Sequence, residues 1–287
     1  MTWLWLVPSL ILAVALVAFL YWLFVIAEGT YLGPRVVAWT YDLVARRYEA
    51  IKQFNRRDES WFVAGPLLQA LAAIEQPLVL DVATGTGRLP LALFRDHFRG
   101  QVVGLDLSLG MLRQARSRLV TYREQVKLVW QDASHLPFDD GAFDAVVSLE
   151  SLEFMPRPLG VLAEMVRVLA PGGVLMLTNR VGHEARLLPG RAIPRPAFRE
   201  ALVRHGLQEV EVRPWQVNYD LALAHKPGAP GPRPGDGTGP AAPIRCPACG
   251  GVLARGAGGL SCSACGRVHE VKEGIIYLAS SKEQSKR

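Results

Sequence analysis

The feature that most constrains the fold is an alternation of short apolar runs with helix-like segments between residues 78 and 178. The runs have about the length of a buried strand. Strands that alternate with helices form a parallel sheet covered by helices on both faces. The sequence therefore predicts an α/β fold with a doubly wound, Rossmann-like sheet. The expected strands are 78–82, 101–105, 126–130, 143–149 and 173–178, with a closing antiparallel pair at 207–212 and 217–224.

The first part of the chain predicts a different environment. Residues 3–27 contain no Asp, Glu, Lys or Arg. As a helix this stretch would span roughly 37 Å, more than the roughly 30 Å hydrocarbon core of a bilayer. A secretory signal peptide would carry basic residues ahead of a shorter apolar core, and this sequence has neither. We expect a single transmembrane anchor helix over 3–27, followed by helices over 36–54 and 61–74.

Basic residues follow the apolar run, beginning with Arg35, Arg46 and Arg47. The positive-inside rule then places everything after residue 28 in the cytoplasm. The formal net charge of +6 would also suit a nucleic-acid-binding protein. Because the sequence has no run of five or six basic residues, attraction to anionic lipid headgroups is the favoured explanation.

Aspartates stand at the ends of three successive expected strands: Asp81, Asp106 and Asp132. In open α/β sheets, ligands bind outside the carboxyl ends of the strands. Asp106 follows Asp81 by about 25 residues, roughly the interval at which dinucleotide folds place the acid that binds ribose. The intervening turn contains small residues that let a backbone approach a ligand; they are Ala83, Thr84, Gly85 and Gly87.

The acid at the start of this turn indicates the kind of ligand. A pyrophosphate cofactor prefers G-x-G-x-x-G without an acid, whereas this turn reads D-x-A-x-G-x-G. A carboxylate at residue 81 opposes a phosphate and favours a ligand with positive charge, such as S-adenosylmethionine. One strand-end aspartate is commonly a cap or turn residue, but three with a glycine turn indicate a cofactor site.

Four ordered segments resemble the motifs of the class I S-adenosylmethionine-dependent methyltransferases. They are "VLDVATGTG", "VVGLDLSLGMLRQAR", "QDASHLPFDDGAFDAVVSLESLEFM" and "VRVLAPGGVLMLT". The resemblance covers roughly residues 40–225. Within this family, "DVATGTG" and "YDLVARRYEAI" are most similar to the quinone-biosynthesis and small-lipid methyltransferases, although the longer signature of the ubiquinone/menaquinone enzymes is missing after residue 40.

The resemblance implies roles for particular residues. Asp106 would bind the ribose hydroxyls, and Asp132 would accept a hydrogen bond from the adenine amino group beside the Ala133 backbone. The implied cofactor-binding set is Asp81, Ala83, Thr84, Gly85, Gly87, Asp106, Leu107, Met111, Asp132, Ala133 and Leu149.

Catalytic residues are left unassigned by the sequence. Methyl transfer is an in-line displacement that orientation alone can accelerate, and a base is needed only where the acceptor must lose a proton. Glu150 and Glu153 lie in the loop where such a base would sit, although either could instead be a cap or a solvated residue. Tyr41 and Tyr48 would either close over the pocket or pack in the core. His135 and His183 are expected to be solvated loop residues.

The four cysteines of the chain form the pattern C-x2-C-x12-C-x2-C. This spacing gives two thiolate pairs that can close a tetrahedral zinc site. The predicted ligands of this structural Zn2+ are Cys246, Cys249, Cys262 and Cys265. The segment with its "GRVHEVKEGIIYL" tail resembles the small zinc-ribbon proteins that activate methyltransferases, and the zinc ribbon of certain rRNA methyltransferases. Zinc would either serve recognition or simply hold a small segment together.

These observations divide the chain into an anchor (3–27), a methyltransferase domain (36–225), a Pro/Gly linker (226–243) and a zinc ribbon (244–279). The expected protein is single-pass in the cell membrane, with a cytoplasmic catalytic domain that methylates a hydrophobic, membrane-resident acceptor, either a lipid or a quinone-like molecule. Two alternatives remain: an RNA methyltransferase that uses the ribbon for recognition, and a non-catalytic scaffold that binds the cofactor.

Overall fold

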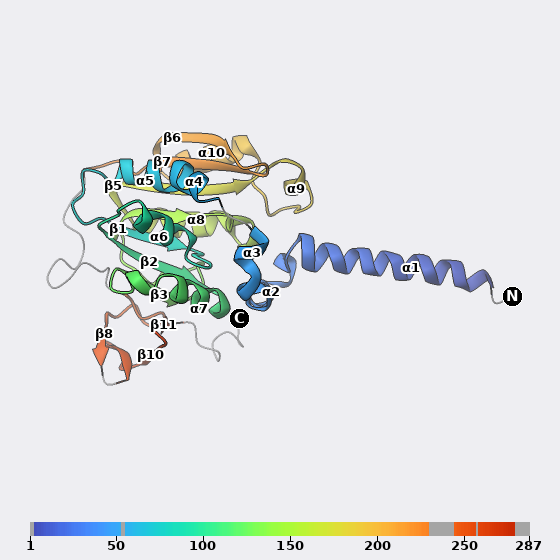
Figure 1. Ribbon diagram of the computed structural model, residues 1–287, viewed down its shortest axis with the longest axis horizontal. Helices are drawn as coiled ribbons and strands as arrows, with labels where there is room; N and C mark the ends of the chain where they lie inside the picture. Colours follow the sequence, from blue (N-terminus) through green and yellow to red (C-terminus); the bar gives the residue numbers. More distant parts are fainter. Residues whose placement is uncertain (1–2, 53–54, 230–243, 257, 279–287) are drawn as a thin grey trace.

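The computed structural model describes residues 3–52, 55–229, 244–256 and 258–278. Most of the expected linker, residues 230–243, lies outside the described residues. Figure 1 shows a body built around one twisted sheet, from which a long helix projects at the amino-terminal end.

A parallel sheet forms the centre of the body, as the alternation of strands and helices predicts. Its strands are β1 (Leu78–Val82), β2 (Gln101–Asp106), β3 (Val126–Trp130), β4 (Phe143–Ser148) and β5 (Leu169–Arg180). They lie in the order β5-β4-β1-β2-β3, and β6 (Gln208–Trp215) and β7 (Tyr219–His225) extend it antiparallel beyond β5. The fifth strand begins four residues earlier than expected, because Leu169 pairs with Phe143 before a register shift.

Alternate residues of β1 face two different helical layers. Leu78, Leu80 and Val82 share a buried cluster with α8 (Pro158–Val168) and α10 (Arg195–Arg204). Val79 shares the other cluster with α5 (Gly65–Ala70), α6 (Arg88–Arg95) and α7 (Leu109–Arg118). Both faces of the strand are therefore covered, which explains why all five of its residues are buried.

The two helices expected ahead of β1 are each interrupted. The first is α2 (Pro34–Val44) and α3 (Tyr48–Lys52), with a 3-10 turn at Ala45–Arg47 between them. The second is α4 (Arg56–Glu59), a π-helical turn at Ser60–Ala64, and α5. α2 and α3 both lie beside the ends of β1 and β2 (Figure 1), where Tyr41 of α2 and Tyr48 of α3 line a pocket.

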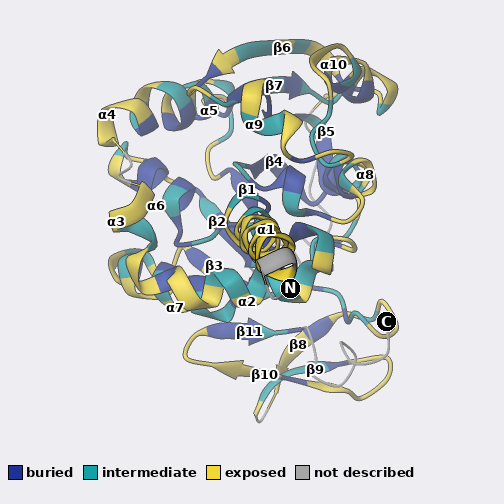
Figure 2. Cartoon of the chain, turned by 90° about the vertical axis from the view of Figure 1, so that its right-hand side faces the viewer, coloured by how far each residue is buried: buried dark blue, intermediate teal, exposed yellow. Residues whose placement is uncertain are grey.

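The projecting helix is α1 (Trp3–Tyr21), continued by a π-helical turn at Trp22–Ile26. The span Trp5–Ile26 has a mean hydropathy of 2.7 and only 6% of it is buried. It is long and apolar enough to cross a membrane, although a signal sequence in this place would have the same properties. Figure 2 looks along α1 and shows exposed residues around it, with α2 at its base.

The cysteine-containing segment adds four strands to the same sheet. They are β8 (Leu253–Gly256), β9 (Gly259–Cys262), β10 (Val268–Lys272) and β11 (Ile275–Tyr277). β11 pairs in parallel with β3 and covers its edge, giving an 11-stranded order that ends β3-β11-β10-β9-β8. Ile276 and Cys246 join the cluster on the α8 side of the sheet, and Ile275 joins the cluster on the other side.

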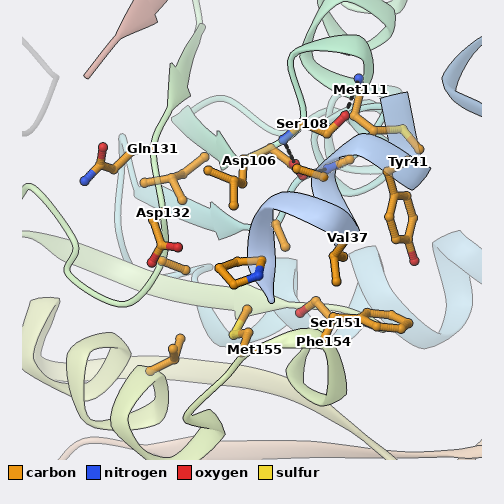
Figure 3. Close-up of a pocket in the computed structure, with 18 of the residues that line it drawn as sticks. Val37, Tyr41, Asp106, Ser108, Met111, Gln131, Asp132, Ser151, Phe154 and Met155 are labelled. Atoms are coloured by element: carbon orange, nitrogen blue, oxygen red, sulfur yellow. Dashed lines mark hydrogen bonds between the residues drawn. The ribbon is translucent and has the colours of Figure 1, made fainter. Parts of the chain in front are cut away.

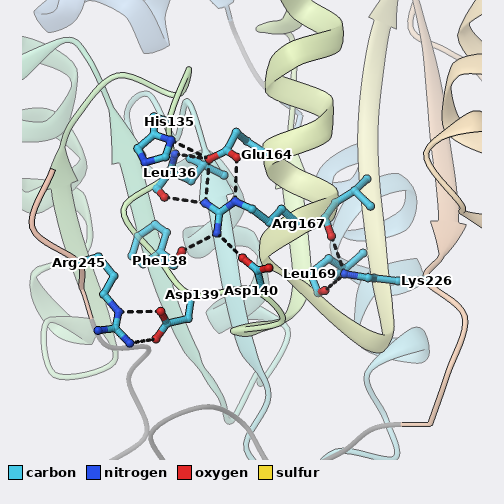
Figure 4. A network of polar contacts seen from close by, with 11 residues as sticks. His135, Leu136, Phe138, Asp139, Asp140, Glu164, Arg167, Leu169, Lys226 and Arg245 are labelled. Atoms are coloured by element: carbon cyan, nitrogen blue, oxygen red, sulfur yellow. Dashed lines mark hydrogen bonds and ion pairs between the residues drawn. The ribbon is translucent and has the colours of Figure 1, made fainter. Parts of the chain in front are cut away.

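Polar contacts also connect this segment to the body. Arg245 donates two hydrogen bonds of 2.6 Å to the Asp139 carboxylate. The same loop is held from the other side by Arg167 of α8, which bonds Asp140 and the Phe138 carbonyl, each at 2.8 Å (Figure 4). The segment is therefore docked on the sheet by backbone pairing, apolar packing and an ion pair. The division of the chain into anchor, methyltransferase domain, linker and zinc ribbon stays a prediction.

Candidate cofactor pocket and metal centre

A pocket lies at the carboxyl ends of β1, β2, β3 and β4, where the strand-end aspartates predict a ligand site. Its empty space is about 840 Å3, a volume that includes solvent at the open mouth. Helix α2 forms one wall, and the segment from Leu149 to Pro156 forms another (Figure 3). Of the predicted set, the residues that line it are Ala83, Gly85, Asp106, Leu107, Met111, Asp132, Ala133 and Leu149.

Asp106 is held in the pocket by two backbone donors. The Gly85 N–H donates to its Oδ2 atom and the Ser108 N–H to its Oδ1 atom, both at 2.8 Å. Burial raises the pKa of the carboxyl group to about 6 despite these donors. Each carboxylate oxygen keeps a further lone pair, so the group can accept hydrogen bonds from a ligand with two neighbouring hydroxyls.

Asp132 lies at the end of β3, on the same side of the pocket as Gln131 (Figure 3). Its Oδ1 atom accepts a hydrogen bond of 2.6 Å from the Ser134 N–H. Leu107 and Met111 add apolar surface to the pocket. The Leu107 carbonyl accepts a hydrogen bond of 2.8 Å from the Trp130 indole. A flat aromatic ligand with an amino edge fits this combination of a carboxylate with apolar walls.

The other three predicted residues stand behind the pocket lining. Asp81 is buried and accepts a hydrogen bond of 2.5 Å from the Thr84 hydroxyl. Burial raises the pKa of Asp81 to about 7. Gly87 has φ +75°, and a Cβ atom there would lie 2.7 Å from Leu119 Cδ1. Glycine at 87 is therefore required by the turn and by its packing against the end of α7.

The two glutamates considered as bases have different surroundings. Glu150 lines the pocket with φ 49°. It accepts hydrogen bonds from Arg88 at 2.6 Å and Lys52 at 3.0 Å. Burial would raise the Glu150 pKa, but these two cations bring it below its ordinary value. Glu150 is thus an ion-paired carboxylate, poorly suited to accept a proton.

Glu153 is fully buried and does not line the pocket. The Tyr219 phenol donates a hydrogen bond of 2.5 Å to it, and Arg180 lies 3.3 Å away. Tyr41 and Tyr48 do line the pocket, together with Phe154. The residues Pro34, Val37 and Ala38 of α2 were missed by sequence reasoning. The helical periodicity of 36–54 marks an apolar face, but not which surface that face covers.

The two histidines expected in loops lie outside the pocket lining and are exposed, although His183 belongs to the short helix α9 (Gly182–Arg186). His135 makes a surface ion pair with Glu164 at 3.5 Å (Figure 4). They agree with the expectation of solvated residues.

The four cysteines converge at the base of the ribbon. Their sulfur atoms all lie within 4.8 Å of one another. Cys249 and Cys262 are 3.4 Å apart, and Cys246 and Cys265 are 3.9 Å apart. Zn–S bonds of about 2.3 Å in a tetrahedron place sulfurs about 3.8 Å apart. The donor set and its spacing therefore fit Zn2+.

The thiols of the cluster affect one another in opposite directions. The Cys265 backbone N–H lowers the pKa of the Cys262 thiol to about 6, whereas hydrogen bonds with the neighbouring thiols raise the pKa of Cys249 despite the Gly251 N–H. The thiolate is the form that binds metal. His269 Nε2 lies 3.5 Å from Cys246 Sγ, beside the cluster.

Comparison with known proteins identifies the domain around the pocket. Residues 80–177 match the family described as "Methyltransferase domain". The demethylmenaquinone methyltransferase of Clavibacter sepedonicus is 36% identical over 146 residues, which cover 50% of this chain and 58% of that protein. The malonyl-[acyl-carrier protein] O-methyltransferase of Geobacter sulfurreducens is 33% identical over 157 residues, covering 48% and 58%. The chain thus spans little more than half the length of these relatives.

Solved structures share the fold. The [4+2]-cyclase SpnF superposes with a TM-score of 0.57 and 21% identity, covering 69% of this chain and 97% of that one. Its name shows that the fold alone does not specify the reaction. The sequence match and the pocket at the strand ends carry the assignment instead. Residues 80–177 are a methyltransferase domain of the class I, S-adenosylmethionine-dependent type.

Proposed function

We propose that the protein transfers a methyl group from S-adenosylmethionine to a hydrophobic acceptor resident in the membrane. The observation that carries this proposal is the pocket itself, where Asp106 and Asp132 join a turn of small residues at the strand ends of a methyltransferase domain. Asp106 would accept from the ribose hydroxyls, and Asp132 from the adenine amino group. Asp81 would balance the cationic amino-acid end from behind the turn.

S-adenosylmethionine supplies a methyl carbon that its sulfonium already activates. The protein's part is then to hold donor and acceptor in line and to exclude water. The Asp106 carboxylate is fixed by two backbone N–H groups, so it orients the ligand without reorganising. Helix α2 covers the pocket, and Pro34, Val37 and Ala38 present an apolar surface to it.

The acceptor side of the pocket is apolar and lies close to the base of α1. Phe154, Met155 and Pro156 line this side. The membrane-length helix ends only a few residues before α2, so the anchor would place the pocket beside the bilayer (Figure 1). Several relatives are named for demethylmenaquinone or ubiquinone/menaquinone methylation. We therefore take a quinone-like or lipid molecule as the acceptor.

The remaining parts of the chain complete this proposal. Residues 3–27 would anchor the protein once in the cell membrane, with the catalytic domain of 36–225 in the cytoplasm. The linker of 226–243 would tether the ribbon of 244–279, in which Cys246, Cys249, Cys262 and Cys265 hold a structural Zn2+. Docking of β11 on β3 favours a structural role for the ribbon.

The test is to incubate the full-length protein in detergent–lipid micelles with methyl-labelled S-adenosylmethionine and a cell lysate. Label in the lipid fraction with the wild type, lost with Asp106→Ala, would support the proposal. Label in RNA would overturn the membrane acceptor and make the ribbon a recognition module. Cofactor binding without transfer to any fraction would indicate a non-catalytic scaffold.

A further inference from the structure

Helix α2 has two apolar faces, and only one of them is covered. Pro34, Val37 and Tyr41 line the pocket. At about 100° per residue, these three residues share one face of the helix, whereas Trp39 and Leu43 lie on the opposite face. Trp39 is 54% exposed and Leu43 is 66% exposed. Large apolar side chains that gather on a surface mark a site of interaction, so this second face needs a partner.

Arginines accompany the apolar side chains on this second face. Arg35 lies one turn ahead of Trp39, and Arg46 and Arg47 follow Leu43 in the 3-10 turn that ends α2. All three arginines are exposed, and none of them forms an ion pair with another described residue. We define these five residues as the outer face of α2. The combination of tryptophan, leucine and basic residues is typical of a helix that lies on anionic lipid.

The one acid of α2 does not neutralise the outer face. Asp42 accepts hydrogen bonds from the Ser108 hydroxyl at 2.5 Å and from the Gly110 N–H at 2.7 Å, where α7 begins. Its carboxylate is therefore turned toward the body of the protein. The outer face keeps the positive charge of its arginines.

The outer face points to the side of the molecule from which α1 projects. The pocket face of α2 covers the carboxyl ends of the strands, so the outer face is turned away from the sheet. Figure 1 shows α1 leaving the body beyond α2, and Figure 2 shows α2 at the base of α1. A bilayer crossed by α1 would therefore have its nearer surface beside the outer face.

Contacts fix the base of α1 to the body, so this orientation does not depend on a flexible linker. The Trp22 indole donates a hydrogen bond of 3.0 Å to the Leu187 carbonyl, and the Tyr31 phenol donates one of 2.9 Å to the Pro189 carbonyl. The Trp22 and Tyr31 rings also stack, with their centroids 5.2 Å apart. These contacts hold both ends of the turn between α1 and α2, so α2 has a fixed orientation relative to α1.

We infer that the outer face of α2 binds the anionic phospholipid surface of the membrane that α1 crosses. The inference rests on the membrane anchor of the proposed function and assigns the surface that docks beside it. Trp39 and Leu43 enter the boundary between headgroups and acyl chains, where an apolar helix face is buried by about 5–10 Å. The arginines reach the headgroup phosphates, and each favours the docked state by about fivefold.

A lipid surface fits this face better than a protein partner does. A helix that crosses the bilayer brings headgroups to its own base, where the outer face lies, and the unpaired arginines complement their negative charge. An α-helix with its side chains is about 10–12 Å wide. The pocket face of α2 would then lie within about this distance of the headgroups, so a hydrophobic acceptor would leave the bilayer by only one helix width.

The experiment uses the full-length protein reconstituted in vesicles of phosphatidylglycerol and phosphatidylcholine. Bromine atoms on the acyl chains quench the fluorescence of tryptophans that touch them. The emission of one tryptophan is the difference between the wild type and its phenylalanine variant. Trp39 should lose about half of its emission or more in brominated vesicles, because its ring reaches the acyl chains. Trp5 of α1 should be quenched too.

The matched control is Trp61, which is 77% exposed and lies in the turn after α4, away from the base of α1 (Figure 1). Its emission should not change in brominated vesicles. If Trp5 is quenched and Trp39 is not, the outer face does not touch lipid and the inference is overturned. Protection of Trp39 from aqueous iodide without quenching by lipid would mean that a second copy of the chain covers the face, which also overturns it.

The choice of anionic lipid is tested in equimolar vesicles in which only one lipid is brominated. Brominated phosphatidylglycerol should quench Trp39 more strongly than brominated phosphatidylcholine. Replacing Arg35, Arg46 and Arg47 together by glutamine should remove this preference, whereas replacing all three by lysine should keep it, since the attraction depends on charge. Equal quenching of the wild type by the two brominated lipids would overturn the assignment of an anionic surface.

These measurements need neither S-adenosylmethionine nor an acceptor, so they separate the two proposals. Quenching of Trp39 without methyl transfer to any fraction would support the outer face as a lipid surface while the proposed function fails. Methyl transfer to lipid without quenching of Trp39 would give the reverse result. Trp39→Phe and the glutamine variant should keep the Kd for S-adenosylmethionine within about threefold of wild type, because surface changes of this kind rarely affect the fold.

Discussion

Replacing Asp106 by asparagine tests the placement of the cofactor most directly. Both carboxylate oxygens already accept backbone N–H groups at 2.8 Å. Asparagine has one acceptor oxygen, so its NH2 group would face one of these donors and one backbone N–H would lose its partner. Hydrogen bonds to charged groups contribute about 1.5–3 kcal/mol each. Losing the charge opposite two ribose hydroxyls should therefore weaken S-adenosylmethionine binding by about 100-fold or more at pH 7.5.

The pH dependence of binding gives an independent check. The free carboxyl group has a pKa raised to about 6, and hydroxyl donors bind its ionised form. The affinity of the wild type should therefore be constant above the pKa and fall about tenfold per pH unit below it. The pKa of Asp81 is raised to about 7, so its protonation should cause a second, separate fall in affinity with decreasing pH. Asp81→Asn would remove this second fall.

Isothermal titration calorimetry between pH 5 and 7.5 measures both effects. Asp106→Asn should remove the fall in affinity near pH 6 and leave the fall that comes from protonation of Asp81. If Asp106→Asn binds S-adenosylmethionine as tightly as wild type, or if it keeps the fall in affinity near pH 6, then Asp106 is not the ribose ligand.

Other regions of the chain give further predictions. Gly87→Ala should lower the free energy of unfolding by about 2–4 kcal/mol in chemical denaturation, because it combines a left-handed residue with overpacking against Leu119. Tyr277→Ala removes the ring that meets Trp130 at 5.3 Å and should lower stability by at least about 1 kcal/mol; calorimetry should also show weaker S-adenosylmethionine binding. Cys246→Ser or chelation should lower the Tm of the methyltransferase domain as well as unfold the ribbon, since zinc binding energy is folding energy for such segments; unchanged domain melting would show that the ribbon is energetically separate.

The sheet and the position of the pocket could be predicted because both follow from local patterns. A parallel strand covered on both faces, such as Leu78–Val82, is buried throughout and apolar apart from Asp81, and the acids at the strand ends meet at one edge of the sheet. The sequence also indicates the loop after β4 as part of the site, and Leu149, Glu150 and Ser151 of this loop line the pocket. It does not distinguish Glu150 from Glu153, because that difference depends on Arg88, Lys52, Tyr219 and Arg180. These four residues come from distant parts of the chain.

The position of the ribbon could not be predicted from its cysteines. Their spacing specifies how two thiolate pairs close around a metal, and it does so whether the module is free or docked. Docking depends on Ile275 and Ile276, which alternate between the two faces of the sheet just as a β-strand requires. The apolar pair in "GIIYL" is visible in the sequence, but the strand edge that accepts it is formed by residues about 150 positions earlier.

Docking of β11 connects the metal centre to the cofactor pocket through one short chain of contacts. Tyr277 pairs with Trp130 in register, and the Trp130 indole donates to the Leu107 carbonyl at 2.8 Å. Leu107 follows Asp106 and lines the pocket. Without β11 the edge of β3 would expose unpaired backbone groups, and the Trp130 ring would lose the Tyr277 ring. Zinc should thus support S-adenosylmethionine binding from outside the pocket, by holding in place the strand that leads into Gln131 and Asp132 of the pocket lining.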